Sequence, residues 1–133
     1  MPAYSENPSG YSEKVWSRFR HPAHAGQLEQ ENQQVVTGSS RDPATGEVVQ
    51  IWLHVEDGRI IAARFKALGS PVTIAAASLA AEKLEGMPID ATQQLSGRTL
   101  VKALSAPVEK TSCGLLVEDA IRAALKSVAA AQS

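Results

Sequence analysis

The chain contains a single cysteine, Cys113, in the stretch KTSCGLLVEDAIRAAL at residues 110–125. A helix is predicted to begin here with Thr111 or Ser112 as its cap, which places the thiol at the positive end of the helix. Lys110 adds positive charge nearby, and both features favour a thiolate that acts as a nucleophile, a sulfur acceptor or a metal ligand. A small buried apolar residue is an equally good interpretation, because free cysteine is often buried.

The three histidines show no spacing that is typical of a metal site. His21 and His24 lie in a loop that contains proline, and His54 alternates onto the polar side of a predicted strand. A metal site would need carboxylates or thiolates close to them. We therefore expect histidines that face solvent or make local hydrogen bonds. The segment GSPVT at 69–73 also lacks the Gly-Lys-Ser pattern of a phosphate loop.

Glu47 and Ser70 stand where the predicted sheet gives way to turns. Glu47 follows Gly46 at the start of the second strand, and Ser70 follows Gly69 at the end of the third. Loops can converge at such places. Taken locally, however, Ser70 before Pro71 is a good helix N-cap, and Glu47 is a charged turn residue. These residues alone do not indicate an enzyme.

A three-stranded antiparallel meander is predicted to position them. Alternation along residues 48–55 indicates a strand with one face inward. Trp52 and His54 fall on the outward face of this strand. Asp57-Gly58 indicates a tight hairpin, because this pair tolerates positive φ. The inward residues are Val49, Ile51, Leu53 and Val55; the strands are expected at 35–41, 48–55 and 59–67, with the DPATG turn at 42–46.

Helices are predicted before and after this sheet. A first helix is expected within 11–19, ended by His21-Pro22, and residues 23–34 are expected to form a loop. The Ala-rich segment 71–86 favours a helix that begins at Pro71 and stops at Gly86. Two short helices are expected at 90–95, capped by Asp90, and at 98–104, with Gly97 as a break between them. The final helix carries an apolar stripe of Leu116, Ala120, Ala124 and Val128. The fold class is α+β, with helices covering one face of the sheet.

Composition fits one globular domain over residues 1–133, with residues 1–10 as a loose terminus. The net charge of -1 argues against a nucleic-acid partner. No apolar run is long enough to span a membrane, and the first residues do not resemble a signal peptide. A lone cysteine cannot form an internal disulfide, which favours a reducing cytoplasm.

The order of these segments resembles the U-type iron–sulfur cluster scaffold family, which includes IscU and the N-terminal domain of NifU. The resemblance runs from about Tyr11 to Ala129. It rests on YSEKVWSRFRHPAHAGQL at the opening helix, on ARFKALGS as the most specific segment, and on KTSCGLLVEDAIRAAL at the final helix. It implies a SufE/NifU-like fold in which helices, one of them a long C-terminal helix, cover the meander.

The resemblance also implies a set of site residues. Members of the family hold iron, zinc or a nascent cluster with three cysteines, an aspartate and a histidine. By position, Thr45 and Ser70 replace the first two cysteines, Glu47 replaces the aspartate, Ser112 replaces the histidine, and Cys113 and Lys110 are retained. Lys110 and Ser112 are the residues expected to activate the thiol. Iron–sulfur clusters are held chiefly by thiolates. The resemblance therefore implies a degenerate site that binds iron or a labile cluster weakly. The segment SAPVEK at 105–110 also departs from the family's chaperone-recognition motif, Leu-Pro-Pro-Val-Lys.

Three functions remain open. The favoured one is a non-enzymatic protein of cytoplasmic iron–sulfur cluster assembly, which binds a desulfurase or a target protein, or holds iron through Cys113 and Glu47. A homodimer could bring two copies of Cys113 together around one cluster. The alternatives are a persulfide or thiol carrier that uses Cys113, and a binding or regulatory module whose site is inactive.

Overall fold

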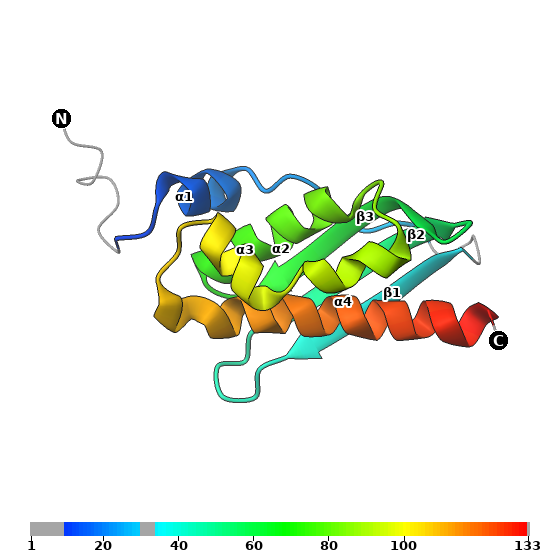
Figure 1. Ribbon diagram of the computed structural model, residues 1–133. Helices are drawn as coiled ribbons and strands as arrows, with labels where there is room; N and C mark the ends of the chain where they lie inside the picture. Colours follow the sequence, from blue (N-terminus) through cyan, green and yellow to red (C-terminus); the bar gives the residue numbers. More distant parts are fainter. Residues whose placement is uncertain (1–9, 30–33, 133) are drawn as a thin grey trace.

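The structure is a computed structural model that describes residues 10–29 and 34–132 (Figure 1). The expected loose terminus, apart from Gly10, and residues 30–33 of the expected loop lie outside the described residues. The elements in chain order are α1 (Glu13–Arg20), β1 (Val35–Arg41), β2 (Val48–Glu56), β3 (Arg59–Leu68), α2 (Pro71–Leu84), the 3₁₀ helix η2 (Ile89–Gln94), α3 (Gly97–Ala103), the 3₁₀ helix η3 (Val108–Lys110) and α4 (Thr111–Gln132).

The sheet is the predicted antiparallel meander, with strand order β1-β2-β3. Asp57 and Gly58 join β2 to β3 with φ of 51° and 73°. Positive φ at both residues gives the turn a twist that matches the flanking strands. Glu56 therefore pairs with Arg59 at this end, and Val48 pairs with Leu68 at the other end.

Helices α2 and α4 cover one face of the sheet (Figure 1). The long helix α4 packs on β1 and β2, α2 packs on β3, and α1 and α3 lie against α2 and α4. Gly38 permits the close approach of α4, because a Cβ on this strand residue would overlap the backbone of Ala120 and Ala124. The predicted inward residues of β2 and the predicted stripe of α4 are all buried in this core.

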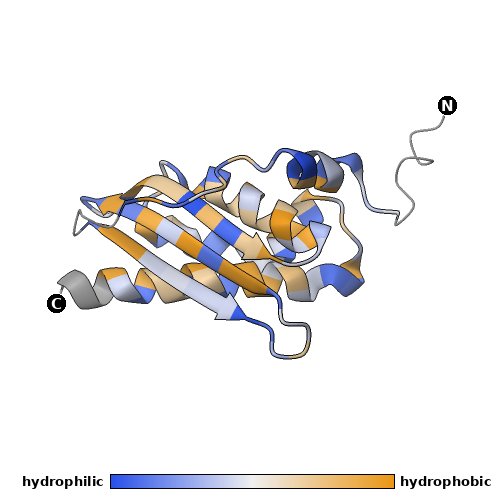
Figure 2. Cartoon of the chain, turned by 180° about the vertical axis from the view of Figure 1, so that it is seen from behind, coloured by the Kyte–Doolittle hydropathy of each residue, from blue (hydrophilic) through white to orange (hydrophobic). Residues whose placement is uncertain are grey.

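Figure 2 views the sheet from the side opposite α2 and α4, and hydrophilic and hydrophobic residues alternate along its strands. The hydrophilic ones are directed mostly at this outer face. Trp52 lies on this face, as predicted, yet it is buried rather than open to solvent. The Lys66 ammonium lies 5.8 Å from the centroid of its ring. Long side chains of neighbouring strands can cover an aromatic ring in this way while their charged ends stay in water.

Three predicted helix boundaries are wrong. Asp90 does not cap the helix at 89–94, because Pro88 stands at that position and no side chain there accepts a cap hydrogen bond. Gly97 does not break the chain but begins α3, where Ser96 and Thr99 form a capping box. Neither Thr111 nor Ser112 caps α4, since the chain enters α4 directly from η3.

The predicted capping by Thr111 fails because its hydroxyl has another partner. The hydroxyl donates a hydrogen bond to the Val108 carbonyl at 2.5 Å. The backbone of Thr111 is already helical, whereas an N-cap is extended. The first helix, expected within 11–19, begins at Glu13 and runs to Arg20. Ser12 caps α1, with its side chain accepting from the Val15 amide.

In the part of the chain that the structure describes, no helix combines the length and apolar character needed to cross a bilayer.

Candidate functional site

The β1–β2 turn brings Glu47 to the beginning of α2. Asp42 organises this turn by accepting a hydrogen bond from the Ala44 amide at 2.9 Å, while its backbone pairs with Gly46 and Glu47. Gly46 has a φ of 78°, which glycine adopts without strain. Glu47, the residue before β2, therefore has its side chain directed at the loop between β3 and α2.

One oxygen of the Glu47 carboxylate is held by two donors from that loop. The Ser70 amide donates to Oε1 at 3.0 Å, and the Thr73 hydroxyl donates to the same atom at 2.5 Å. Gly69 makes room for this contact, since a Cβ at position 69 would overlap the carboxylate. An anion at this place is also favoured by the positive end of α2. The carboxylate therefore ties two chain segments together and leaves Oε2 as its less committed oxygen.

Ser70 links this carboxylate to the lone thiol. Its backbone amide binds Glu47, and its side-chain oxygen lies 3.5 Å from Cys113 Sγ. The same oxygen accepts from the Thr73 amide at 3.4 Å, so Ser70 is the predicted N-cap of α2. Cys113 is only 6% exposed. The structure thus brings Glu47, Ser70 and Cys113 into one polar group at the ends of two helices.

Lys110 lies close enough to this group to interact with it electrostatically. The pKa of Lys110 lies above its ordinary value of 10.5, chiefly because of a hydrogen-bonding interaction with Tyr11. Electrostatic interactions with Cys113 and Glu47 add to this effect. Lys110 Nζ also lies 5.8 Å from the centroid of the Tyr11 ring. Lys110 is therefore a cation at neutral pH, within electrostatic range of the thiol and the carboxylate.

Thr45 and Ser112 have fewer contacts with the group formed by Glu47, Ser70 and Cys113. The Thr45 hydroxyl oxygen accepts from the Glu47 amide at 3.2 Å, which fixes the turn. Both side chains are exposed. Ser112 precedes Cys113 in α4, and successive helical residues point about 100° apart at 3.6 residues per turn. That Thr45 takes a ligand position and that Ser112 activates the thiol both stay predictions.

Thr73 was missed by sequence reasoning. It is fully buried, and its hydroxyl contacts both Glu47 and Ser70. Only its position three residues after an N-cap could have drawn attention to it, and that position says nothing about a carboxylate 26 residues away.

The donor set does not fit an iron–sulfur cluster held by one chain. It offers one thiol, one carboxylate with a committed oxygen, and hydroxyls that ionise poorly. Among residues 10–29 and 34–132, no three His, Cys, Asp or Glu side chains group in a way that could hold a metal ion. Such a set suits a single weakly bound cation better than a cluster, which thiolates hold.

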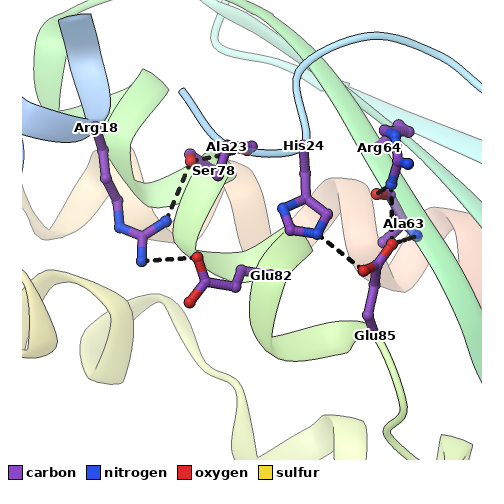
Figure 3. A network of polar contacts seen from close by, with 8 residues as sticks. All are labelled: Arg18, Ala23, His24, Ala63, Arg64, Ser78, Glu82 and Glu85. Carbon is purple, nitrogen blue, oxygen red and sulfur yellow. Dashed lines mark hydrogen bonds and ion pairs between the residues drawn. The ribbon is translucent and has the colours of Figure 1, made fainter. Parts of the chain in front are cut away.

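The histidines lie away from this group. His54 Nε2 lies 2.7 Å from Glu56, a local partner as predicted. His24 is different, because its Nε2 lies 2.8 Å from Oε1 of Glu85, 61 residues away (Figure 3). The prediction of a solvent-facing or locally bonded histidine is therefore wrong for His24. Its φ of 70° turns the backbone so that its carbonyl accepts from Phe65 of β3.

Glu85 gathers three donors at the end of α2. Burial alone would raise the pKa of its carboxyl, but hydrogen bonds from the Ala63 amide, His24 and Arg64 together hold that pKa below its ordinary value of 4.5. The Ala63 amide and Arg64 both contact Oε2 at 2.9 Å (Figure 3). The cluster joins the loop before β1, strand β3 and α2, so its role is structural.

Comparison with known proteins places this geometry in context. Residues 10–133 match the family model described as "NifU-like N terminal domain". The chain is 36% identical over 116 residues to the "Iron-sulfur cluster assembly scaffold protein IscU" of Rickettsia prowazekii, covering 86% of this chain and 88% of that protein. It is 38% identical to the "Iron-sulfur cluster assembly enzyme IscU" of Drosophila melanogaster, covering 86% and 75%.

A solved structure shows the same fold. The crystal structure of a putative iron–sulfur cluster assembly scaffold protein for the SUF system from Fervidobacterium islandicum superposes with a TM-score of 0.70. The match covers 93% of this chain and 99% of that one at 13% identity, and at such identity it supports the α+β fold alone.

Proposed function

The chain belongs to the NifU-like N-terminal domain family, and from that premise we propose that it serves iron–sulfur cluster assembly as a scaffold-fold protein with a reduced site. In this proposal Cys113 and Glu47 hold ferrous iron weakly as cargo, and the chain binds protein partners of the assembly machinery. It acts without catalysing a reaction, in a reducing cytoplasm.

One observation carries the proposal. Ser70 touches Cys113 with its side chain and Glu47 with its backbone, so three of the residues that the family resemblance assigns to the site lie in contact. A thiolate and a free carboxylate oxygen are both ligands that ferrous iron accepts. The hydroxyls beside them contribute hydrogen bonds in place of metal–sulfur bonds. In this proposal the site keeps the family's arrangement while most of its sulfur donors are replaced.

The test is anaerobic titration with ferrous iron, followed by incubation with sulfide. We expect iron that a chelator removes readily, and affinity that falls in both Cys113→Ala and Glu47→Ala. Glu109→Ala is the matched control, since Glu109 is exposed. Iron affinity that is unchanged in both site variants would contradict the proposal, and so would a stable stoichiometric cluster in the unaltered protein.

Partner binding needs its own experiment. We expect a purified cysteine desulfurase to bind the chain reversibly in sedimentation or calorimetry. Absence of binding at concentrations up to about 100 μM, where even transient complexes form, would contradict a role in the assembly machinery. Homodimer formation stays a prediction, and sedimentation of the chain alone would check it.

A persulfide carrier is the second candidate function. It is supported by Lys110 and by the Ser70 hydroxyl beside the thiol. The Cys113 thiolate would attack the terminal sulfur of a donor persulfide. The donor's S–S bond would break, a new S–S bond would form at Cys113, and the donor would leave as a thiolate, with no net oxidation. Mass spectrometry after incubation with a desulfurase and cysteine distinguishes this function by a gain of one sulfur atom.

A further inference from the structure

A groove of about 490 Å³ lies between α1 and the second half of α2, away from the thiol. Thr73 and Glu82 are nine residues apart on α2, which corresponds to about 13 Å along a helix at 1.5 Å per residue. The groove's basic lining residues are Lys14, Arg18, His21 and Lys83. Glu82 is the one acidic residue among the described residues that line it.

Arg18 is held in place and shapes the groove. Its guanidinium contacts Glu82 at 3.1 Å and the buried Ser78 hydroxyl at 3.2 Å (Figure 3). Ser78 in turn donates to the Ala23 carbonyl at 2.9 Å. These contacts fix α1, the loop after it and α2 relative to one another. A preformed groove of this kind binds a partner at a lower entropic cost.

The charge that remains in the groove is positive. Arg18 and Glu82 neutralise each other, whereas Lys14 and Lys83 have no ion pair with any residue that the structure describes. Both lysines are exposed, and His21 lies beside them. The chain as a whole carries a net charge of -1, so this positive surface is local. Local positive charge attracts acidic partners and sets their orientation.

The floor of the groove is apolar. The buried side chains of Leu79 and Leu104 form it, and Ala23 and Ala103 also line the groove. A site for a small phosphate compound would present converging backbone amides or a free arginine fork. Here the arginine is already occupied by Glu82 and Ser78, and the free cations are lysines at the rim. An apolar floor with lysines around it suits a peptide that carries acidic residues on both sides of an apolar one.

We propose that this groove docks an acidic segment of a partner protein, with one apolar side chain on the floor and carboxylates at Lys14 and Lys83. The groove does not include Cys113 or Glu47. The inference therefore goes beyond the proposed function, and it holds or fails independently of iron binding.

The probe for this docking site is a fluorescein-labelled peptide of about twelve residues with a Glu-Glu-Leu repeat. Its control replaces each glutamate with glutamine. We expect saturable binding of the acidic peptide, weakening with salt, and little binding of the control peptide. The double variant Lys14→Glu/Lys83→Glu should raise the Kd by about tenfold or more, since like charges at an interface repel.

A second double variant, with the same net charge as Lys14→Glu/Lys83→Glu, separates docking in the groove from general electrostatic attraction of the peptide. Arg41→Glu/Lys126→Glu changes two exposed cations that do not line the groove, and it should leave the Kd within about twofold. On the unaltered protein, NMR shifts on adding peptide should centre on residues 14–21 and 79–83. Absent or non-saturable binding, equal weakening in both variants, or shifts elsewhere would overturn the proposal. Binding of ADP but not peptide at the same residues would also overturn it.

Discussion

The side-chain oxygen of Ser70 lies 3.5 Å from the sulfur of Cys113, although the two residues are 43 positions apart in the sequence. Ser70 begins α2, and Cys113 lies in the first turn of α4. The backbone amide of the same serine donates to Glu47. One residue therefore joins the thiol to the carboxylate, and it holds the starts of α2 and α4 beside the β1–β2 turn.

Because Cys113 is buried, we expect its thiol to react slowly with alkylating reagents. At 6% exposed, its sulfur is shielded by the helices and by Ser70. Alkylation by iodoacetamide in the folded protein should be at least about tenfold slower than in urea, because thiol reactivity requires access. Mass spectrometry measures both rates.

Ser112→Cys in a Cys113→Ala background provides the matched control, since position 112 is exposed on the same turn of α4. This cysteine should react rapidly. Equal rates at positions 112 and 113 would show that Cys113 is open to solvent, and they would favour the persulfide carrier.

Removal of the Glu47 carboxylate should destabilise the fold. Glu47→Ala leaves the Ser70 amide and the buried Thr73 hydroxyl without their acceptor. Each lost hydrogen bond to a charged group costs about 1.5–3 kcal/mol, so a fall of about 2 kcal/mol or more in the free energy of unfolding is expected. Urea denaturation measures it, with Glu109→Ala as the control. A change within about 0.5 kcal/mol, typical of surface substitutions, would contradict the bridging role.

Glu118 should stabilise the packing of α3 on α4. It is 9% exposed, its Oε1 accepts from the Gly97 amide at 2.7 Å, and Arg122 pairs with its other oxygen. Glu118→Ala should lower the free energy of unfolding by about 2 kcal/mol, because a buried amide loses its acceptor. Asp119→Ala, exposed on the same helix, is the matched control. Equal effects of the two substitutions in thermal unfolding would refute this role.

The lowered pKa of Glu85 leads us to expect that the free energy of unfolding falls at acidic pH. Because its pKa is lowered in the folded protein, its contribution is complete above its ordinary pKa of 4.5 and is lost as the pH falls through the lower folded value. Unfolding free energies measured from pH 6 downward should therefore decline less steeply below about pH 4.5 in Glu85→Gln than in the unaltered protein. Parallel curves for the two proteins would contradict the cluster around Glu85. Glu109→Gln controls for the removal of one negative charge.

Local sequence patterns predicted the elements that position the site. The alternation along 48–55, the Asp57-Gly58 turn and the Ser70-Pro71 start of α2 all depend on near neighbours, and all were confirmed. The start of α4 was predicted wrongly, because η3 precedes it and Thr111 bonds back to Val108. A cap motif is visible in the sequence, whereas a 3₁₀ turn that runs into a helix has no such signature.

The contacts across the molecule could not be predicted from the residues alone. Thr73 meets Glu47, and His24 meets Glu85, only because the strands and helices pack in one particular way. Nothing within a few residues of either partner indicates the other. The family resemblance predicted that positions 45, 47, 70 and 113 would converge, and the contacts of Ser70 join the last three. It could not indicate that a buried threonine would occupy one carboxylate oxygen.

Restoring the lost thiols tests the central claim, which is that the pocket retains the scaffold's architecture but has lost its sulfur donors. The variant Thr45→Cys/Glu47→Asp/Ser70→Cys, incubated without air with ferrous iron and sulfide, should gain protein-bound visible absorption with iron and sulfide in equal amounts. The unaltered protein, and a control with Ser17→Cys/Ser39→Cys at two exposed positions, should not. A restored variant that folds but binds no cluster, or an unaltered protein that already binds one, would contradict the account.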